Sequence, residues 1–209
     1  MKTRCLIVAG GDCNERLFKS VSDDCFVIAA DSGLLHCQST NIMPDLVVGD
    51  FDSYTDKIPY SCQVIKLPVH KDDTDLHFAA RCGIDKGFKD FTIFGGYGSR
   101  PDQNFAMIST LLFISRATAG DVKAICKDFE FHVITESTKI FYKDSAKYLS
   151  VFPLDGNADG VTIKGAEYPL EDAVLTSDFP IGVSNCLMCD TTVSVKKGSL
   201  LIMLVNKNL

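Results

Sequence analysis

The chain has 209 residues, of which 46% are hydrophobic, and a formal net charge of −6. Its 21 basic residues are scattered among 27 acidic ones, which argues against a nucleic-acid partner, because proteins that bind phosphate backbones cluster Lys and Arg. No apolar run approaches the ~20 residues that a membrane span needs, and the first run is too short for a signal peptide. We therefore expect a cytoplasmic protein of one large domain or two modest ones, with no membrane association.

Short apolar runs that end in Gly, Asp or Pro recur through the first half of the chain. This pattern is typical of strands that are buried on both faces of a parallel sheet. The runs lie at residues 4–11, 25–33, 45–50, 62–68 and 90–96.

Two stretches among these runs have the period of amphipathic helices. Residues 74–88 begin with Thr74 in the position of a helix N-cap, and residues 102–117 repeat the apolar spacing. The apolar faces predicted for the two helices are Leu76, Ala79, Ala80, Gly83 and Ile84 in the first, and Phe105, Ile108, Leu111 and Leu112 in the second. Strands that alternate with helices predict an α/β domain with a parallel sheet, whose ligands bind at the carboxyl ends of the strands.

From about residue 121 the pattern changes to strand-length segments separated by Gly, Asp, Asn and Pro. Because no long helical period is present, we predict an antiparallel β domain here. The boundary falls near Gly120–Asp121, which gives one domain at residues 1–120 and a second at 121–209. No internal repeat or low-complexity linker separates them, so we expect two domains packed together.

The nine cysteines are an odd number, and several stand singly inside apolar runs, where a reduced cysteine behaves as a small apolar side chain. We therefore expect thiols. Cys186 and Cys189 have the spacing of a redox or zinc pair. Because no second pair and no nearby histidine accompany them, we interpret this spacing as a coincidence within a strand.

Acidic residues follow three of the predicted parallel strands. They are Asp31 after the second run, Asp50 and Asp52 after the third, and Asp72, Asp73 and Asp75 after the fourth. In a parallel sheet these positions meet at one edge, and crowded carboxylates repel one another unless a cation lies among them. Oxygen ligands without Cys or His favour a hard ion, and Mg²⁺ fits best because it combines one or two carboxylates with substrate phosphates.

Each of these acids taken singly is better explained as a turn former or a helix cap. The joint pattern favours a site, because the stretch with Asp72 and Asp75 contains Lys71 and runs through Thr74 into a helix. The free N–H groups at the start of that helix can hold a phosphate. The combination predicts a site for a magnesium-nucleotide complex.

A glycine-rich stretch, FGGYGSRPDQN at residues 94–104, follows the fifth predicted strand and opens the second helix. Its glycines let backbone N–H groups approach phosphate oxygens, and Arg100 offers the planar donor fork that suits phosphoryl transfer. The stretch is neither a Walker loop nor a G-x-G-x-x-G fingerprint. Taken alone, it is better explained as a tight turn with a surface arginine.

These segments, in this order and at this spacing, resemble the successive motifs of the thiamine pyrophosphokinase family. The resemblance spans about residues 4–205, and five ordered motifs are far more specific than one. The segments are AADSG at 29–33, MPDLVVGDFDS at 43–53, KDDTDL at 71–76, GGYGSRPDQN at 95–104 and GVSN at 182–185.

The resemblance implies an α/β domain that binds ATP and Mg²⁺, followed by a C-terminal β-sandwich for thiamine binding and dimerisation. It implies a homodimer with active sites at the subunit interface. It also implies the reaction, in which the thiamine hydroxyl attacks the β-phosphorus of ATP, pyrophosphate is transferred and AMP leaves. Such transfer consists mainly of positioning and charge neutralisation.

The resemblance further implies roles for individual residues. Asp50, Asp52 and Asp75 would hold Mg²⁺, and Asp31 and Asp72 would border the same acidic cluster. The residues implied to face the phosphates are Lys71 and Arg100, with Thr74 at the helix start, and those implied to meet thiamine are Ser184 and Asn185, with Asp102 and Gln103 as weaker candidates. The sequence assigns no strong general base: Asp72 or Asp75 could accept the hydroxyl proton, but a metal ligand is a poor base.

Several positions depart from the family pattern. Ser32 stands in place of a usual Gly, Ser99 replaces the Gly before Arg100, and His77 replaces a frequent Glu. Cys186 stands where Glu is common in the bacterial members. Since the chain has no Trp, any aromatic contact to thiamine must come from Phe or Tyr.

Two other functions compete with this one. The first is another magnesium-dependent nucleotide phosphotransferase or hydrolase on the same scaffold, because a fold does not fix a substrate. The second is a homologue that binds thiamine or a nucleotide without turnover. Against this second alternative, a binder without catalysis has little reason to keep so many mutually repelling carboxylates.

Overall fold

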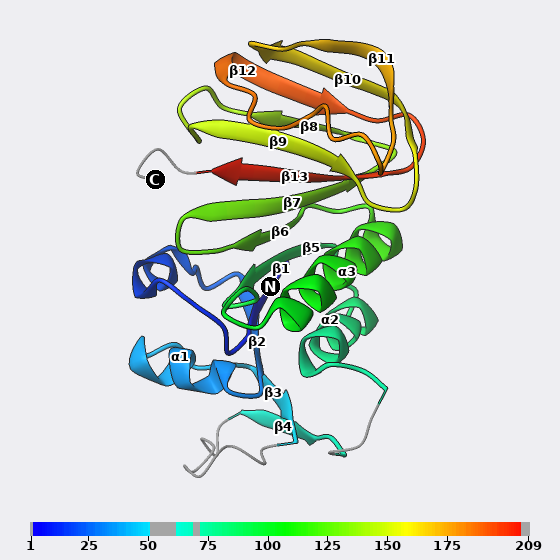
Figure 1. Cartoon of the computed structure of the whole chain (residues 1–209). Helices are drawn as coiled ribbons and strands as arrows, with labels where there is room; N and C mark the ends of the chain where they lie inside the picture. Colours follow the sequence, from blue (N-terminus) through cyan, green and yellow to red (C-terminus); the bar gives the residue numbers. More distant parts are fainter. Residues whose placement is uncertain (1, 51–61, 69–71, 206–209) are drawn as a thin grey trace. The chain divides into compact units, whose positions relative to one another are not determined.

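The computed structural model describes residues 2–50, 62–68 and 72–205 of the chain (Figure 1). The chain divides into two compact units. The first contains the described residues up to Gly120 together with Ala124–Lys127, and the second contains Asp121–Lys123 and the described residues from Asp128 onward.

The first unit is built on parallel strands in the order β4-β3-β2-β1-β5. In the central register, Ile7 pairs with Ile28 on one side and with Ile93 on the other, and all three side chains are fully buried. The parallel sheet confirms the predicted α/β class. The strands are β1 (Arg4–Val8), β2 (Cys25–Ala30), β3 (Leu46–Gly49), β4 (Gln63–Lys66) and β5 (Asp90–Phe94).

Helices cover both faces of this sheet, with α2 and α3 on one side and α1 on the other (Figure 1). On the α1 side, Leu6 and Val8 pack with Leu34 in one buried cluster. On the α2 side, a Cβ added at Gly83 would meet the Cys5 Sγ and the Phe91 ring within 3.0 Å, so glycine lets this helix lie close to the sheet. The helices are η1 (Glu15–Ser20), α1 (Gly33–Ser39), α2 (Asp75–Asp85) and α3 (Pro101–Thr118).

The N-cap predicted for α2 is confirmed, since the Thr74 hydroxyl accepts a hydrogen bond from the His77 N–H at 3.1 Å. The apolar face predicted for α3 is only partly correct. Leu111 is buried, but Phe105 is 76% exposed, and the buried side also contains Met107 and Thr110. Apolar residues occur on most sides of this helix, so spacing alone does not tell which side faces the core.

The second unit contains two antiparallel sheets that share one core, which confirms the predicted antiparallel C-terminal region. One sheet has the order β7-β13-β9, and the other β11-β10-β12-β8. Val151 and Ile202 from the first sheet pack in one cluster with Val161 and Val193 from the second. The strands are β7 (Phe129–Thr135), β8 (Thr138–Phe141), β9 (Tyr148–Pro153), β10 (Ala158–Ala166), β11 (Leu170–Leu175), β12 (Leu187–Ser194) and β13 (Ser199–Val205), while the residues of β6 (Val122–Ile125) are divided between the two units.

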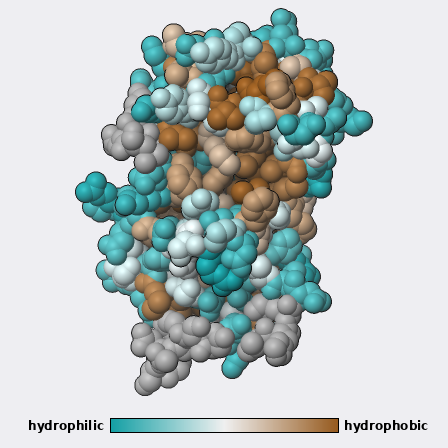
Figure 2. Space-filling model, in the orientation of Figure 1, coloured by the Kyte–Doolittle hydropathy of each residue, from teal (hydrophilic) through white to brown (hydrophobic). Residues whose placement is uncertain are grey.

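Some large apolar side chains of the second unit are exposed, and Figure 2 shows brown, apolar surface among its polar side chains. The exposed residues include Tyr168, Val174, Phe179, Ile181, Val183 and Met188. Within the described residues, no helix has the length and apolar character needed to cross a membrane. The nine cysteines form no disulfide there, and burial raises the pKa of the Cys37 thiol to about 12.

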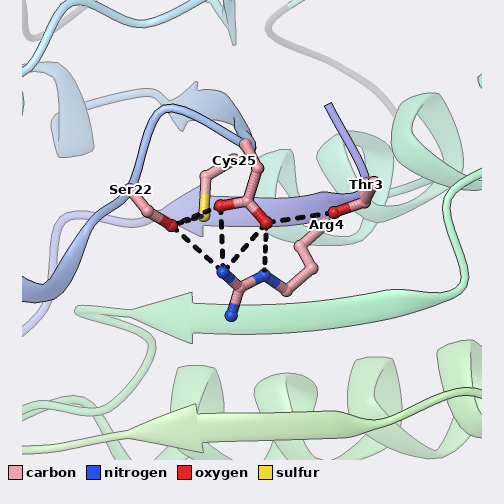
Figure 3. A network of polar contacts seen from close by, with 5 residues as sticks. Thr3, Arg4, Ser22 and Cys25 are labelled. Carbon is pink, nitrogen blue, oxygen red and sulfur yellow. Dashed lines mark hydrogen bonds and ion pairs between the residues drawn. The ribbon is translucent and has the colours of Figure 1, made fainter. Parts of the chain in front are cut away.

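A network of polar contacts joins the amino ends of β1 and β2 (Figure 3). The Arg4 guanidinium donates to both carboxylate oxygens of Asp24, with Nη2–Oδ1 at 2.9 Å and Nε–Oδ2 at 3.2 Å, and also to the Ser22 hydroxyl at 3.0 Å. Thr3 donates to the same carboxylate at 3.0 Å. These hydrogen bonds lower the pKa of Asp24, with that from Arg4 as the largest cause. The network lies at the opposite end of the parallel strands from their carboxyl ends.

Candidate active site

A pocket of about 560 Å³ opens at the carboxyl ends of the parallel strands in the first unit. Its walls come from the loops after β1, β2, β3, β4 and β5 and from the first turns of α2 and α3. This is the edge at which ligands bind in parallel α/β sheets. The lining includes Gly10, Gly11, Asp12, Asp31, Asp50, Asp73, Thr74, Asp75, Gly95, Tyr97, Gly98, Ser99, Arg100, Gln103 and Asn104.

Two glycine-containing loops meet at the base of this pocket. The Gly11 N–H donates to the Gly95 carbonyl at 2.7 Å, and the Asp12 N–H donates to the Tyr97 carbonyl at 2.8 Å. A Cβ at Gly11 would lie 2.6 Å from both of those carbonyl oxygens, so only glycine allows this approach. Gly95 has a φ of +63° and is equally tight, since its Cβ would lie 2.2 Å from the Ala9 carbonyl oxygen.

Sequence reasoning missed the loop at Gly10–Asp12, which it treated as the end of a strand. The sequence does contain a sign of this loop, since two glycines and an acid follow the first strand. Glycines and acids also follow the strands whose loops were predicted to bind ligands. His36 on α1 also contacts this loop, with its Nε2 2.9 Å from the Gly11 carbonyl oxygen.

The structure brings Asp31, Asp50, Asp73 and Asp75 to the lining of the one pocket, although they come from three loops. Asp31 has a φ of +48°, and its N–H donates to the Val48 carbonyl of the neighbouring strand at 2.7 Å. A positive φ is uncommon outside glycine and fixes the direction in which this side chain leaves the turn. Asp73 forms an ion pair with Arg81 at 2.7 Å. The predicted residue Asp72 is exposed and does not line the pocket.

The donor set around the pocket consists of carboxylate oxygens without Cys or His, which suits Mg²⁺. Among the described residues, no three acidic, His or Cys side chains lie together closely enough to form a metal site on their own. Mg²⁺ normally takes one or two carboxylates and completes its shell with phosphate and water oxygens. Asp50 and Asp75 fit that need, whereas Asp52 and Lys71 lie outside the described residues.

The cationic side of the pocket is formed by Arg100, an exposed residue that precedes the first turn of α3. Its Nη2 lies 2.5 Å from Asp102 Oδ2 and its Nε lies 3.3 Å from Oδ1. The hydrogen bond from Arg100 is the largest cause that lowers the pKa of Asp102. Asp102 itself does not line the pocket, whereas Gln103 does.

The predicted thiamine residues Ser184 and Asn185 belong to the second unit. Ser184 is exposed, has a φ of +59°, and donates its N–H to the Ser150 hydroxyl at 3.0 Å. Asn185 is 4% exposed, and its side-chain amide accepts from the Tyr168 N–H at 2.9 Å and donates to the Tyr168 carbonyl at 2.7 Å. The Asn185 amide is thus engaged with the backbone, while the Ser184 hydroxyl lies on an exposed residue.

Two family models match the chain and together cover both units. The thiamin pyrophosphokinase catalytic domain matches residues 18–124, and the thiamin pyrophosphokinase vitamin B1 binding domain matches residues 132–200. The chain belongs to the thiamin pyrophosphokinase family. The first match includes the carboxylates and the glycine-rich loop of the pocket, and the second includes Ser184 and Asn185.

Individual relatives support this assignment, and their names, thiamine or thiamin pyrophosphokinase, are those of an enzyme. Thiamine pyrophosphokinase of Bacillus subtilis (strain 168) is 28% identical over 205 residues, which cover 94% of this chain and 95% of that protein. A crystal structure of thiamine pyrophosphokinase from Bacillus subtilis has a TM-score of 0.89 at 26% identity and covers 98% of this chain and 100% of its own. The fold is also similar to that of thiamin pyrophosphokinase from Candida albicans, with a TM-score of 0.79, 14% identity and coverage of 98% and 90%.

Proposed function

We propose that the protein transfers pyrophosphate from ATP to the hydroxyl of thiamine. The thiamine oxygen forms a bond to the β-phosphorus, the bond from that phosphorus to the oxygen bridging to the α-phosphorus breaks, and the hydroxyl proton is released. The products are thiamine diphosphate and AMP. The observation that carries this proposal is the pocket of the first unit, in which carboxylates from three loops lie with Arg100 and a glycine-rich loop inside the match to the catalytic-domain model.

The residues of the pocket divide into an anionic and a cationic group. In our proposal Asp50, Asp52 and Asp75 hold Mg²⁺, and Asp31 adds negative charge beside them, while Asp72 lies just outside the pocket lining. Bound Mg²⁺ would supply neutralisation of phosphate charge, which is its usual part in phosphoryl transfer. Within the described residues, Asp50 and Asp75 line the same pocket as Asp31, which supports this grouping.

The cationic group orients the triphosphate. Arg100 and Lys71 face the phosphate oxygens, where the planar guanidinium of Arg100 can donate two parallel hydrogen bonds. Thr74 caps the His77 N–H and, with the first turn of α2, lines the pocket, which supports a contact between this helix start and a phosphate. Gln103 and Asp102 are weaker candidates for contact with the second substrate.

We place the thiamine contacts on the second unit, at Ser184 and near Asn185, and we propose that the protein is a cytoplasmic homodimer with these residues near the subunit interface. The exposed apolar side chains of this unit, among them Tyr168 and Phe179, support a surface that a second copy covers (Figure 2). Residues 1–120 would then act as the catalytic domain and residues 121–209 as the domain for thiamine binding and dimerisation. Sedimentation at micromolar concentration should give about twice the 22.9 kDa chain mass.

One assay tests the proposed reaction directly. The protein is incubated with ATP, Mg²⁺ and thiamine, and the nucleotides and thiamine esters are separated and quantified. AMP and thiamine diphosphate should form in equal amounts, and neither should form without thiamine. Release of ADP and phosphate at the same rate with and without thiamine would contradict the proposal and favour a nucleotide hydrolase. Binding of both ligands without product would favour a non-catalytic homologue.

A further inference from the structure

Asn104 makes a reciprocal pair of hydrogen bonds with one residue of the glycine-rich loop. Its Oδ1 accepts from the Gly98 N–H at 2.9 Å, and its Nδ2 donates to the Gly98 carbonyl at 2.9 Å. A side-chain amide is well suited to this task, because it carries an acceptor and a donor side by side, as a neighbouring strand would. The backbone N–H and the carbonyl of Gly98 are therefore both held by a single side chain from the first turns of α3.

We propose that Asn104 is a positioning residue, which fixes the segment Gly98–Arg100 so that Arg100 meets the triphosphate in one orientation. This inference rests on the proposed function and gives a role to Asn104, which ends the motif at residues 95–104 but received no role from the sequence. Asn104 lies within the pocket lining and holds the segment at two points. Its side chain holds Gly98, and its N–H donates to the Arg100 carbonyl at 3.1 Å.

The start of α3 explains why the segment needs such support. Arg100 occupies the N-cap position but makes no side-chain cap, and Pro101 follows it without an N–H. The Arg100 side chain is exposed, and its described partner is the equally exposed Asp102 two residues on. Exposed ion pairs of this kind hold a side chain weakly. The backbone on which Arg100 is mounted must therefore be fixed from elsewhere.

The loop after β1 also contacts this segment. A Cβ placed on Gly98 would contact the Asp12 nitrogen and the Gly11 Cα at 3.4 Å, so the two loops touch at this point. The bond from the Asp12 N–H to the Tyr97 carbonyl anchors the residue before Gly98. Gly98 is thus held both by the Asn104 side chain and by contact with the Gly11–Asp12 backbone. Ser99 and Arg100 follow directly after this fixed residue.

The substitution Asn104→Ala removes both bonds to Gly98 and leaves α3 otherwise unchanged, because alanine is a good helix former. The turnover number should fall on the order of 10- to 100-fold, which is the effect of a misplaced phosphate-orienting group. The Michaelis constant for thiamine should change less than twofold. Asn104→Asp keeps the acceptor for the Gly98 N–H and should retain slow exchange of that amide. The matched control is Ser109→Ala, an exposed position on the same helix whose hydroxyl bonds only the Phe105 carbonyl among its described contacts.

Two readouts separate positioning from a general structural role. Amide hydrogen exchange at Gly98 should accelerate in Asn104→Ala while exchange in the β1 and β5 strands stays as in the unmodified protein. In a double-mutant cycle, the losses in turnover caused by Asn104→Ala and by Arg100→Lys should not add. In Asn104→Ala the loop is already displaced and Arg100 is no longer correctly oriented, so replacing it has less effect. Fully additive losses, or normal turnover and normal Mg·ATP affinity in Asn104→Ala, would overturn the inference.

Mg·ATP binding measured by calorimetry without thiamine keeps this test distinct from that of the reaction. If the unmodified protein binds Mg·ATP but does not make thiamine diphosphate, the proposed function fails. The inference then stands or falls on whether Asn104→Ala weakens Mg·ATP binding at least fivefold relative to Ser109→Ala. A protein that binds no Mg·ATP at all overturns both.

Discussion

Arg100 and Asp102 form a two-pronged ion pair at the mouth of the pocket, with Nη2–Oδ2 at 2.5 Å and Nε–Oδ1 at 3.3 Å. A very similar fork joins Arg4 and Asp24 at the other end of the same sheet (Figure 3). The two forks have the same chemistry, but only Arg100 lies in the pocket lining. Substitution of Arg4 is therefore a control for substitution of Arg100.

We predict that Arg100→Lys lowers the turnover number much more than it weakens thiamine binding. Lysine keeps the positive charge but loses the planar fork that donates two hydrogen bonds to a phosphate. The matched variant Arg4→Lys makes the same chemical change away from the pocket and should leave turnover within about twofold, since exposed ion pairs contribute little to stability. Steady-state kinetics with each substrate varied in turn gives the turnover number and the Michaelis constants of both variants. Equal losses in the two variants would remove Arg100 from the phosphate site.

We predict that Asp52→Asn or Asp75→Asn abolishes turnover and leaves the protein folded. For Asp75 two small effects on stability oppose each other. Removing one of the carboxylates that line the pocket relieves some repulsion between them, but an acid in the first turn of α2 interacts favourably with the helix dipole. The net change in the free energy of unfolding should stay below about 1 kcal/mol. Asp85→Asn at the other end of α2 is the control and should retain normal turnover and Mg²⁺ dependence. Near-normal activity in Asp75→Asn would exclude that residue from the metal site.

The contacts of Asn185 separate it from its neighbour Ser184. The sequence motif predicts that Asn185→Ala raises the Michaelis constant for thiamine and leaves that for ATP unchanged. Because the buried amide bonds both backbone groups of Tyr168, we now also expect a loss of about 1–3 kcal/mol in the free energy of unfolding, the cost of leaving such groups without partners. Ser184→Ala on the exposed residue should raise the same constant without that loss. Chemical denaturation beside kinetics distinguishes the two, and an unchanged thiamine response in both would move the thiamine site elsewhere.

Much of the fold follows from local patterns that the sequence displays directly. The runs that end in Gly or Asp become the parallel strands, and Thr74 caps α2 as its position before an acidic first turn predicts. The placement of Asp31, Asp50 and Asp75 follows from topology alone, because the carboxyl ends of parallel strands share one edge. These inferences succeeded because each depends on chain direction and on residue type at a strand end.

The inferences that failed or were missed depend on contacts between distant segments. Phe105 has the spacing of a core residue but is exposed, because α3 is apolar on several sides and its neighbours decide which side is buried. Gly11 is required by two carbonyl groups from the loop after β5, which the sequence places more than 80 residues away. The engagement of Asn185 with Tyr168 likewise depends on the bend between β10 and β11 meeting the segment before β12. No periodicity in the sequence records such contacts.

His132 gives the stability of the second unit a dependence on pH. Its ring is 4% exposed, with Nε2 at 2.9 Å from Glu130 Oε2, and the ring of Phe141 packs against it. Burial lowers the pKa of His132 and is the largest cause, the nearby Lys139 lowers it further, and the partner Glu130 opposes both. At neutral pH the ring is therefore neutral and donates its Nε2–H to an ionised Glu130. Among the described residues, its buried Nδ1 has no hydrogen-bond partner.

The sign of the pH effect follows from this lowered pKa. Unfolding exposes the ring, whose ordinary pKa is about 6.5, so below that pH the unfolded chain binds a proton that the folded chain does not. The contribution of His132 to stability is thus fully present above about pH 6.5 and is lost as the pH falls from there toward its lowered folded pKa. The lowered pKa values of Glu130 and Asp121 add a separate loss at still lower pH. We predict that His132→Gln, which keeps an N–H donor near Glu130 but cannot titrate, removes the decline in stability that begins as the pH falls below about 6.5 in denaturation experiments. His36→Gln on the first unit is the control and should leave that decline in place, and an unchanged decline in His132→Gln would assign it to other groups.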